Sequence, residues 1–134
     1  MRRYTRVPTV FALTTMMALS TAAWAGAKGG SGVTLTTSGD NGTASGSMGA
    51  VRSSADTVQF IGCVVSGSGT HEWVSCSARN ASNVAVSCSS ADPAIVHAAQ
   101  TMTADAHLSF SWNGSGACTA LHVRTDSRYT PKQP

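Results

Sequence analysis

Four cysteines constrain this chain more than any other feature of its sequence. Cys63, Cys76, Cys88 and Cys118 are separated by 13, 12 and 30 residues and include no Cys-x-x-Cys pair. Structural zinc sites usually take their ligands from such close pairs, so this spacing favours two disulfides over a bound metal ion. A chain of 134 residues has room for one small core, and disulfides commonly support a core of that size in exported proteins.

The N-terminal segment has the pattern of a secretory signal peptide. Three arginines lie in the first six residues, an apolar stretch covers residues 10–19, and Ala23 and Ala25 are small residues of the kind a signal peptidase reads. A spanning helix needs about 20 mainly apolar residues, and threonines and serines interrupt this shorter run. We therefore expect residues 1–25 to be cleaved, no transmembrane segment to remain, and the protein to be secreted to the periplasm or the cell exterior.

The distribution of charge argues against nucleic acid as a partner. The formal charge of the chain is +3, but three of its basic residues lie in the predicted signal peptide. Six basic and six acidic residues follow residue 25, so this remainder is neutral apart from histidine. Nucleic-acid binding needs clustered lysine and arginine. A protein or a cell-envelope component is the partner we expect instead.

The composition predicts a flexible leader ahead of the folded domain. Residues 26–54 are dominated by glycine, serine and threonine, and such a segment buries too little apolar area to offset its ordering entropy. The alternative is that Val33–Thr36 adds one edge strand to the domain behind it. We expect the disulfide-bonded domain to cover residues 55–130 and a polar tail to cover residues 131–134.

Strand patterns dominate the predicted domain. Residues 57–65, 72–78 and 84–88 are short apolar or β-branched runs separated by turn residues. Asp92 and Pro93 then provide a helix start, because the carboxylate caps free N–H groups and proline fits the first helical position. The helix that follows carries an apolar stripe over about three turns, and its members are Ile95, Ala98, Ala99 and Met102.

The clearest hairpin pattern covers residues 107–123. Alternation places Leu108, Phe110 and Trp112 on one face, and a glycine-rich turn follows. If Trp112 pairs with Ala117, His107 lies directly opposite His122. These elements predict an α+β fold in which one short helix packs on a small antiparallel β-sheet with two disulfides. Among the three possible connectivities, local strand pairing favours Cys63–Cys76 with Cys88–Cys118.

No pattern in the sequence indicates catalysis or a cofactor. His107 and His122 are the weak candidates for a metal site, since two facing imidazoles can share an ion, but no spacing favours a third ligand. The chain lacks a Gly-x-Ser-x-Gly motif and contains one glutamate, Glu72, which excludes a pair of glutamates for glycoside hydrolysis. We therefore expect a protein that is not an enzyme and holds no cofactor.

Trp73 is the aromatic residue that we expect to be exposed. It lies beside Glu72 and a glycine-rich loop, whereas Phe60, Phe110 and Trp112 fit the core better. Exposed aromatic side chains often carry the binding energy of a recognition surface. Trp73 is therefore a candidate binding residue.

The cysteine frame resembles that of the secreted subtilisin-inhibitor family. The segment from Cys63 to His71 with Cys76, and Cys88 shortly before Asp92 with Cys118 thirty residues on, looks like the two-disulfide frame of that family. The resemblance implies a sandwich of antiparallel sheet and helices, with a protease-binding loop just after the third cysteine. The corresponding residues here are Ser89, Ser90 and Ala91.

The leading interpretation is a small secreted, non-enzymatic domain that acts as a surface binding or envelope-associated module. A protease inhibitor and a protein that binds metal through its histidine pair are the alternatives.

Overall fold

The computed structural model describes residues 29–129, so the predicted signal peptide over 1–25 and the tail over 131–134 lie outside the described residues. Within this range the chain forms seven strands and two helices. In chain order they are β1 (Thr34–Ser38), β2 (Asn41–Ser47), α1 (Met48–Arg52), β3 (Phe60–Ser68), β4 (His71–Arg79), β5 (Ala85–Ser90), α2 (Pro93–Gln100), β6 (His107–Trp112) and β7 (Cys118–Arg124).

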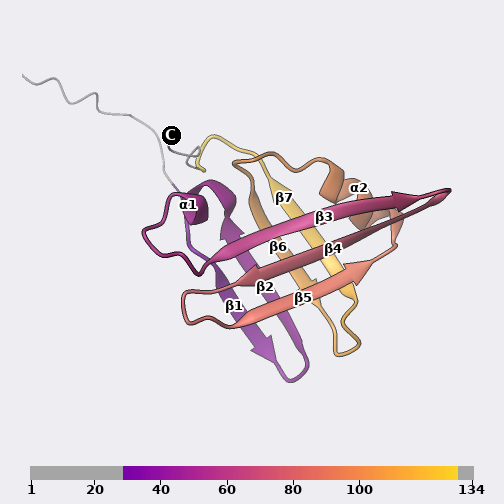
Figure 1. The fold of residues 1–134 in the computed structure, drawn as a ribbon, viewed down its shortest axis with the longest axis horizontal. Helices are drawn as coiled ribbons and strands as arrows, with labels where there is room; N and C mark the ends of the chain where they lie inside the picture. The colour runs from indigo at the N-terminus through magenta and orange to yellow at the C-terminus, as the bar shows by residue number, and fades with distance from the viewer. Residues whose placement is uncertain (1–28, 130–134) are drawn as a thin grey trace, which may run out of the picture.

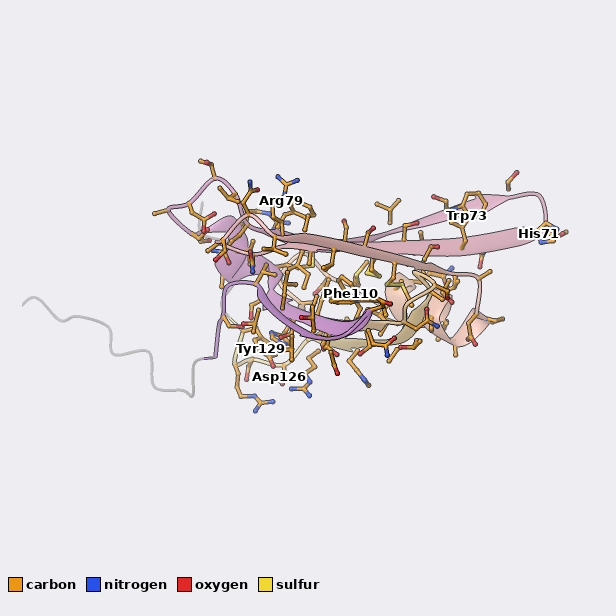
Figure 2. The ribbon with its side chains drawn as sticks, turned by 90° about the horizontal axis from the view of Figure 1, so that it is seen from below. His71, Trp73, Arg79, Phe110, Asp126 and Tyr129 are labelled. Carbon is orange, nitrogen blue, oxygen red and sulfur yellow. A yellow bond between two sulfur atoms is a disulfide. The ribbon has the colours of Figure 1, made fainter. Side chains whose placement is uncertain are left out.

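The strands form two antiparallel sheets that pack face to face. One sheet has the order β1-β2-β6-β7 and the other β3-β4-β5. The three-stranded sheet lies across the four-stranded one (Figure 1), and the two are seen as separate layers from the side (Figure 2). Phe110 and Leu108 from one sheet and Val74 from the other are fully buried between them. The antiparallel strands, a short helix and two disulfides are confirmed, although the strands divide into two sheets and a second helix is present.

Residues 34–52 do not form the flexible leader that we predicted. They fold into β1, β2 and α1, and β1 lies at the edge of the four-stranded sheet. The alternative prediction of an edge strand at Val33–Thr36 therefore comes closer, but this segment also contributes β2, which pairs with β6 at the centre of the sheet. Without it, β6 and β7 would be an isolated hairpin, and such a hairpin has little stability of its own.

Small residues allow this segment to pack despite its low apolar content. Ala44 in β2 is fully buried and pairs with Phe110 in β6. A side chain at Gly42 would meet the ring of Trp112 at 2.3 Å, so the indole covers a position where only glycine fits. The large side chains of β6 therefore supply the apolar area that β2 lacks, and composition counted segment by segment misses this complementarity.

The hairpin of β6 and β7 forms, but its register differs from the predicted one. Phe110 pairs with Leu121, and a β-bulge lies between Ser111 and Trp112. Relative to our prediction the partners shift by two residues along most of the hairpin. A shift of two keeps the side chains of β6 on their predicted faces, and Leu108 and Phe110 are buried as expected. The bulge changes the face of Cys118, which pairs with Trp112 and is buried. The shift also places Arg124 opposite His107, so the predicted His107–His122 pair is wrong.

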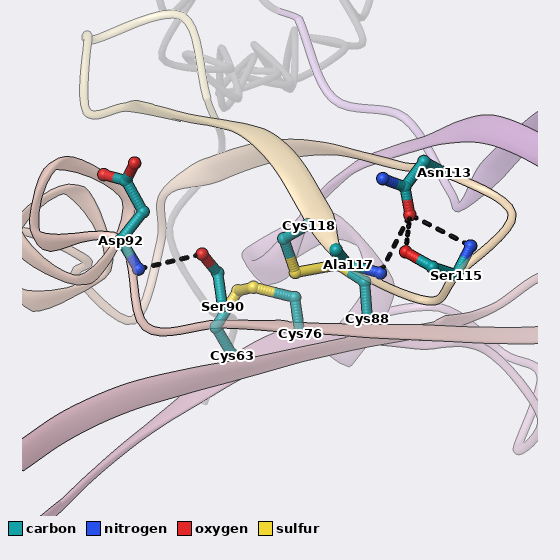
Figure 3. Close-up of a disulfide and its surroundings, with 9 residues drawn as sticks. All are labelled: Cys63, Cys76, Cys88, Ser90, Asp92, Asn113, Ser115, Ala117 and Cys118. Carbon is teal, nitrogen blue, oxygen red and sulfur yellow. Dashed lines mark hydrogen bonds between the residues drawn. A yellow bond between two sulfur atoms is a disulfide. The ribbon is translucent and has the colours of Figure 1, made fainter.

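The turn and the bulge together explain the shift. Asn113 and Ala117 close a loop through a backbone hydrogen bond of 3.1 Å. The Oδ1 atom of Asn113 accepts hydrogen bonds from Ser115 and from the amide of Ala117 (Figure 3), and Gly116 has a positive φ of 76°. This side-chain-stabilised loop is one residue longer than the turn we assumed, so Trp112 pairs with Cys118. The bulge adds the second residue of the shift, so Ser111 pairs with Ala120.

Both predicted disulfides are present: Cys63–Cys76 and Cys88–Cys118. The first joins residues directly opposite each other in β3 and β4. The second runs from β5 to β7 and therefore ties the two sheets together (Figure 3). Two disulfides indicate an oxidising environment outside the cytoplasm.

Helix α2 begins as predicted. The carboxylate of Asp92 accepts a hydrogen bond of 2.8 Å from the amide of Ala94, and Pro93 is the first helical residue. Ala99 and Val96 are buried against the core, and His97 points to solvent as expected. Neither helix in residues 29–129 is long and apolar enough to cross a membrane.

Candidate functional site

Two of the predicted binding residues meet at one pocket. Trp73 and Ala91 both line a pocket of about 430 Å³ beside the hairpin that joins β3 and β4. The hairpin residues from Gly69 to Trp73 form one side, and Pro93 and Val96 of α2 form the other. We call this pocket the β4 notch.

The β4 notch exists because β5 is shorter than β4. Strand β4 pairs with β3 from His71 to Arg79, but with β5 only from Val74 onward. After Ser90 the chain turns away into Asp92 and α2. Neighbouring residues in an antiparallel strand turn their N–H and C=O groups alternately to its two sides. At least one residue of His71–Trp73 therefore turns both backbone groups toward the notch, with no strand of residues 29–129 opposite.

The side chains around the notch combine an aromatic surface with one negative charge. Trp73 is 40% exposed, and the register places it on the outer face of the three-stranded sheet, opposite to the buried Val74. Glu72 has the inward orientation of Val74, and its Oε2 atom accepts a hydrogen bond of 3.4 Å from the side-chain amide of Gln100. His71 is exposed at the tip of the hairpin (Figure 2). The notch thus offers an exposed strand edge, an indole and a carboxylate within one small area.

Ser89 and Ser90 belong to β5 rather than to a separate loop. Ser89 donates a backbone hydrogen bond of 3.1 Å to Gly116, and the hydroxyl of Ser90 accepts one of 3.0 Å from the amide of Asp92 (Figure 3). Ala91 is exposed and follows the strand directly. Of the three residues that the inhibitor resemblance implied as a binding loop, Ala91 alone lies outside the strand.

A second pocket of about 480 Å³ is formed by residues of the four-stranded sheet. Hydroxyl and amide side chains of β1, β2, β6, β7 and the turn after β6 line it, together with Trp112. Among residues 29–129 no titratable side chain lines this pocket, and the indole of Trp112 already lies against Gly42. The β4 notch has the greater variety of groups that can recognise a ligand, so it is the stronger candidate site.

His107 takes part in the fold through neighbours other than His122. Its Nδ1 atom lies 3.1 Å from the hydroxyl of Ser47, which is fully buried, and its ring stacks on Tyr129 with centroids 4.8 Å apart. Burial lowers the pKa of His107 below its ordinary value of 6.5; the positive charge of Arg124 lowers it further, and Asp126 partly opposes the shift. Within residues 29–129, no three histidine, cysteine, aspartate or glutamate side chains form a group that could hold a metal ion.

The lowered pKa of His107 predicts that acidification weakens the fold. Because the folded protein binds this proton less tightly than the unfolded chain does, the free energy of unfolding should fall as the pH drops below 6.5 and level off below the folded-state pKa. The neutral form gives its full contribution above pH 6.5. Arg124→Gln removes one cause of the shift, so we expect an NMR titration to show a higher pKa for His107 in that variant. A wild-type pKa at or above the ordinary value would refute this account.

Comparisons with models of protein families, with curated proteins and with solved structures found no match for this chain.

Sequence reasoning proposed Trp73 and Ala91 as binding residues on separate grounds and missed that both line one pocket. The pocket forms because β5 pairs with β4 only as far as Val74, which leaves His71–Trp73 beside the hairpin without a partner from β5. A sequence pattern predicts the presence of a strand better than the residue at which it ends. Pro93 was a usable signal, because a helix start so close after a strand forces the chain to leave the sheet.

Proposed function

We propose that this protein is a secreted, non-enzymatic binding module that holds an extended segment of a partner protein in the β4 notch. The observation that carries the proposal is the free backbone edge of His71–Trp73 inside a pocket that also contains an exposed indole. A strand edge with unpaired N–H and C=O groups can accept another strand, and adjacent pockets then select its side chains. The two disulfides and the predicted signal peptide support secretion.

The geometry defines what such a segment would contact. A strand added beside His71–Trp73 would continue the line of β5, since Ser90 is the last residue of β5 to pair with β4. Side chains on one face of the added strand would lie near Trp73, and those on the other face would lie near Glu72 and Val96. Because the added strand would contact few residues of β4, side-chain contacts rather than main-chain hydrogen bonds should provide most of the discrimination between partner segments.

Trp73→Ala is expected to abolish most of this binding without unfolding the protein. Short peptides would be selected from a displayed random library against the oxidised protein, and their dissociation constants measured by fluorescence polarisation. Loss of a central aromatic side chain should raise the dissociation constant about tenfold or more, whereas thermal unfolding should change little because Trp73 is 40% exposed.

Phe60→Ala is the matched control, because Phe60 is also 40% exposed but lies at the other end of the same sheet. Its affinity for the selected peptides should stay close to that of the wild type. Equal affinity of wild type and Trp73→Ala for every selected peptide, or failure to select any peptide, would overturn the proposal.

A further inference from the structure

Charged side chains are separated along β4. Arg79 is the last residue of the strand, at the end away from the β3–β4 hairpin (Figure 2), whereas Glu72 is the second residue and lines the β4 notch. Asp92 lies between two residues that line the notch, and its carboxylate offsets the partial positive charge at the start of α2. No lysine or arginine of residues 29–129 lines the notch. Glu72 therefore gives the notch an uncompensated negative charge.

The carboxylate of Glu72 has bonding capacity left for a ligand. Its Oε2 atom accepts one hydrogen bond from Gln100, and the distance of 3.4 Å is long for such a bond. Its ladder partner in β3 is Gly67, which has no side chain to cover it. An ionised carboxylate can accept about four hydrogen bonds. Glu72 can therefore accept further donors from a group that enters the notch.

His71 does not supply the missing positive charge on the side of Glu72. It also lines the notch, but neighbouring residues of a strand turn their side chains to opposite faces of the sheet. The side chain of His71 therefore has the outward orientation of Trp73, and that of Glu72 has the inward orientation of Val74. The only ion pair within residues 29–129 joins Arg128 to Asp126, outside the notch.

We propose that the segment bound in the β4 notch carries a lysine or arginine beside Glu72, next to an apolar residue beside Trp73. This proposal rests on the binding function proposed above and states which segments the notch selects. Side chains of an added strand alternate between the two faces as those of β4 do. The residue beside Glu72 is therefore adjacent in the segment's sequence to the residue beside Trp73.

The change that binding causes around Glu72 explains the preference for a cation. An added strand covers the notch and removes water from the carboxylate, and this loss costs free energy unless a donor replaces the water. Ammonium and guanidinium groups are the best replacements, because their hydrogen bonds to a carboxylate are about twice as strong as neutral ones. An acidic residue at the same position would place two like charges together and weaken binding.

The composition of the selected peptides provides the first test. Peptides selected from the random library against the oxidised wild type should be enriched in lysine or arginine next to an apolar residue. The same selection against Glu72→Gln should lose the enrichment in basic residues and keep the apolar residue. Glutamine preserves the shape of the side chain and removes its charge. Thermal unfolding should stay unchanged because Glu72 is exposed.

A double-mutant cycle tests the contact itself. Glu72→Gln, and replacement of the peptide's basic residue by glutamine, should each raise the dissociation constant about three- to tenfold. Both changes together should raise it little more than either alone, because each removes the same contact. Asp40→Asn is the matched control. Asp40 is exposed in the turn between β1 and β2, outside the notch, so this substitution should leave the dissociation constant unchanged.

The outcomes distinguish this proposal from the binding function on which it rests. Selected peptides that need Trp73 but lack a basic residue, or that bind Glu72→Gln as well as the wild type, would overturn the proposal and leave the binding function intact. Additive effects in the cycle would place the cation elsewhere, and an equal loss in Asp40→Asn would show a general effect of charge. Failure to select any peptide would overturn both proposals.

Discussion

Phe110→Ala is expected to lower the free energy of unfolding by about 3–5 kcal/mol, the range typical of removing a large buried aromatic side chain. Phe110 is 0% exposed, and β6 lies between β2 and β7 in its sheet. Its ring contacts Trp112 at a centroid distance of 6.2 Å, and its ladder partner in β2 is Ala44. Ala44 has no bulk to fill the space, so a cavity should remain.

Denaturant unfolding of the oxidised protein measures this loss. Domains of this size have total stabilities of roughly 5–15 kcal/mol, so Phe110→Ala removes a large share of the total. Phe110→Leu is a milder variant, which should lower the free energy of unfolding by about 1–2 kcal/mol. Phe60→Ala is the exposed control and should cost much less than Phe110→Ala. A similar loss for the buried and the exposed phenylalanine would contradict the assignment of the core.

Removing the Cys88–Cys118 disulfide should have the second large effect. The cysteines are 30 residues apart, and in the chain-entropy account a loop of that length contributes about 3–4 kcal/mol by restricting the unfolded chain. The bond also connects the two sheets, which share no ladder of backbone hydrogen bonds among the named strands. The double substitution Cys88→Ala/Cys118→Ala should therefore lower the free energy of unfolding by about 3–4 kcal/mol, a large share of the roughly 5–15 kcal/mol total.

The other disulfide provides the comparison. Cys63→Ala/Cys76→Ala opens a loop of 13 residues between strands that stay hydrogen-bonded, so denaturant unfolding should show a smaller loss. If removal of Cys63–Cys76 destabilises the protein more than removal of Cys88–Cys118, the inter-sheet bond is not the main covalent support of this fold.

Local patterns predicted the elements of the C-terminal part well. The hairpin of β3 and β4, the cap of α2 by Asp92 and the inward faces of β6 all follow from side-chain chemistry within a few residues. The disulfide pairing followed because Cys63 and Cys76 occupy the two arms of one hairpin. Such features depend on short-range geometry, which the sequence carries directly.

Features that depend on long-range complementarity were not predicted. Residues 34–52 contain too few apolar side chains to suggest a core, and they fold because Gly42 and Ala44 fit beneath Trp112 and Phe110 more than sixty positions later. The loop held by Asn113 and the bulge beside Trp112 moved the β6–β7 register and separated His107 from His122. The hydroxyl that does lie beside His107 belongs to Ser47, a residue assigned to the leader by composition.

The candidate site was half predicted for the same reason. Exposure of Trp73 followed from its polar neighbours, whereas the free edge of β4 followed from where β5 ends relative to the hairpin. The sequence of β4 contains no information about where β5 ends.

The central claim is that the β4 notch is where this protein binds its partner. The most direct test is to titrate a selected peptide into the ¹⁵N-labelled, oxidised protein and to map the amide shifts. We expect the largest changes at Thr70–Trp73 and at Ala91–Val96, on the two sides of the notch. Changes centred instead on the pocket beside Thr36 and Trp112, or along β3, would contradict the claim.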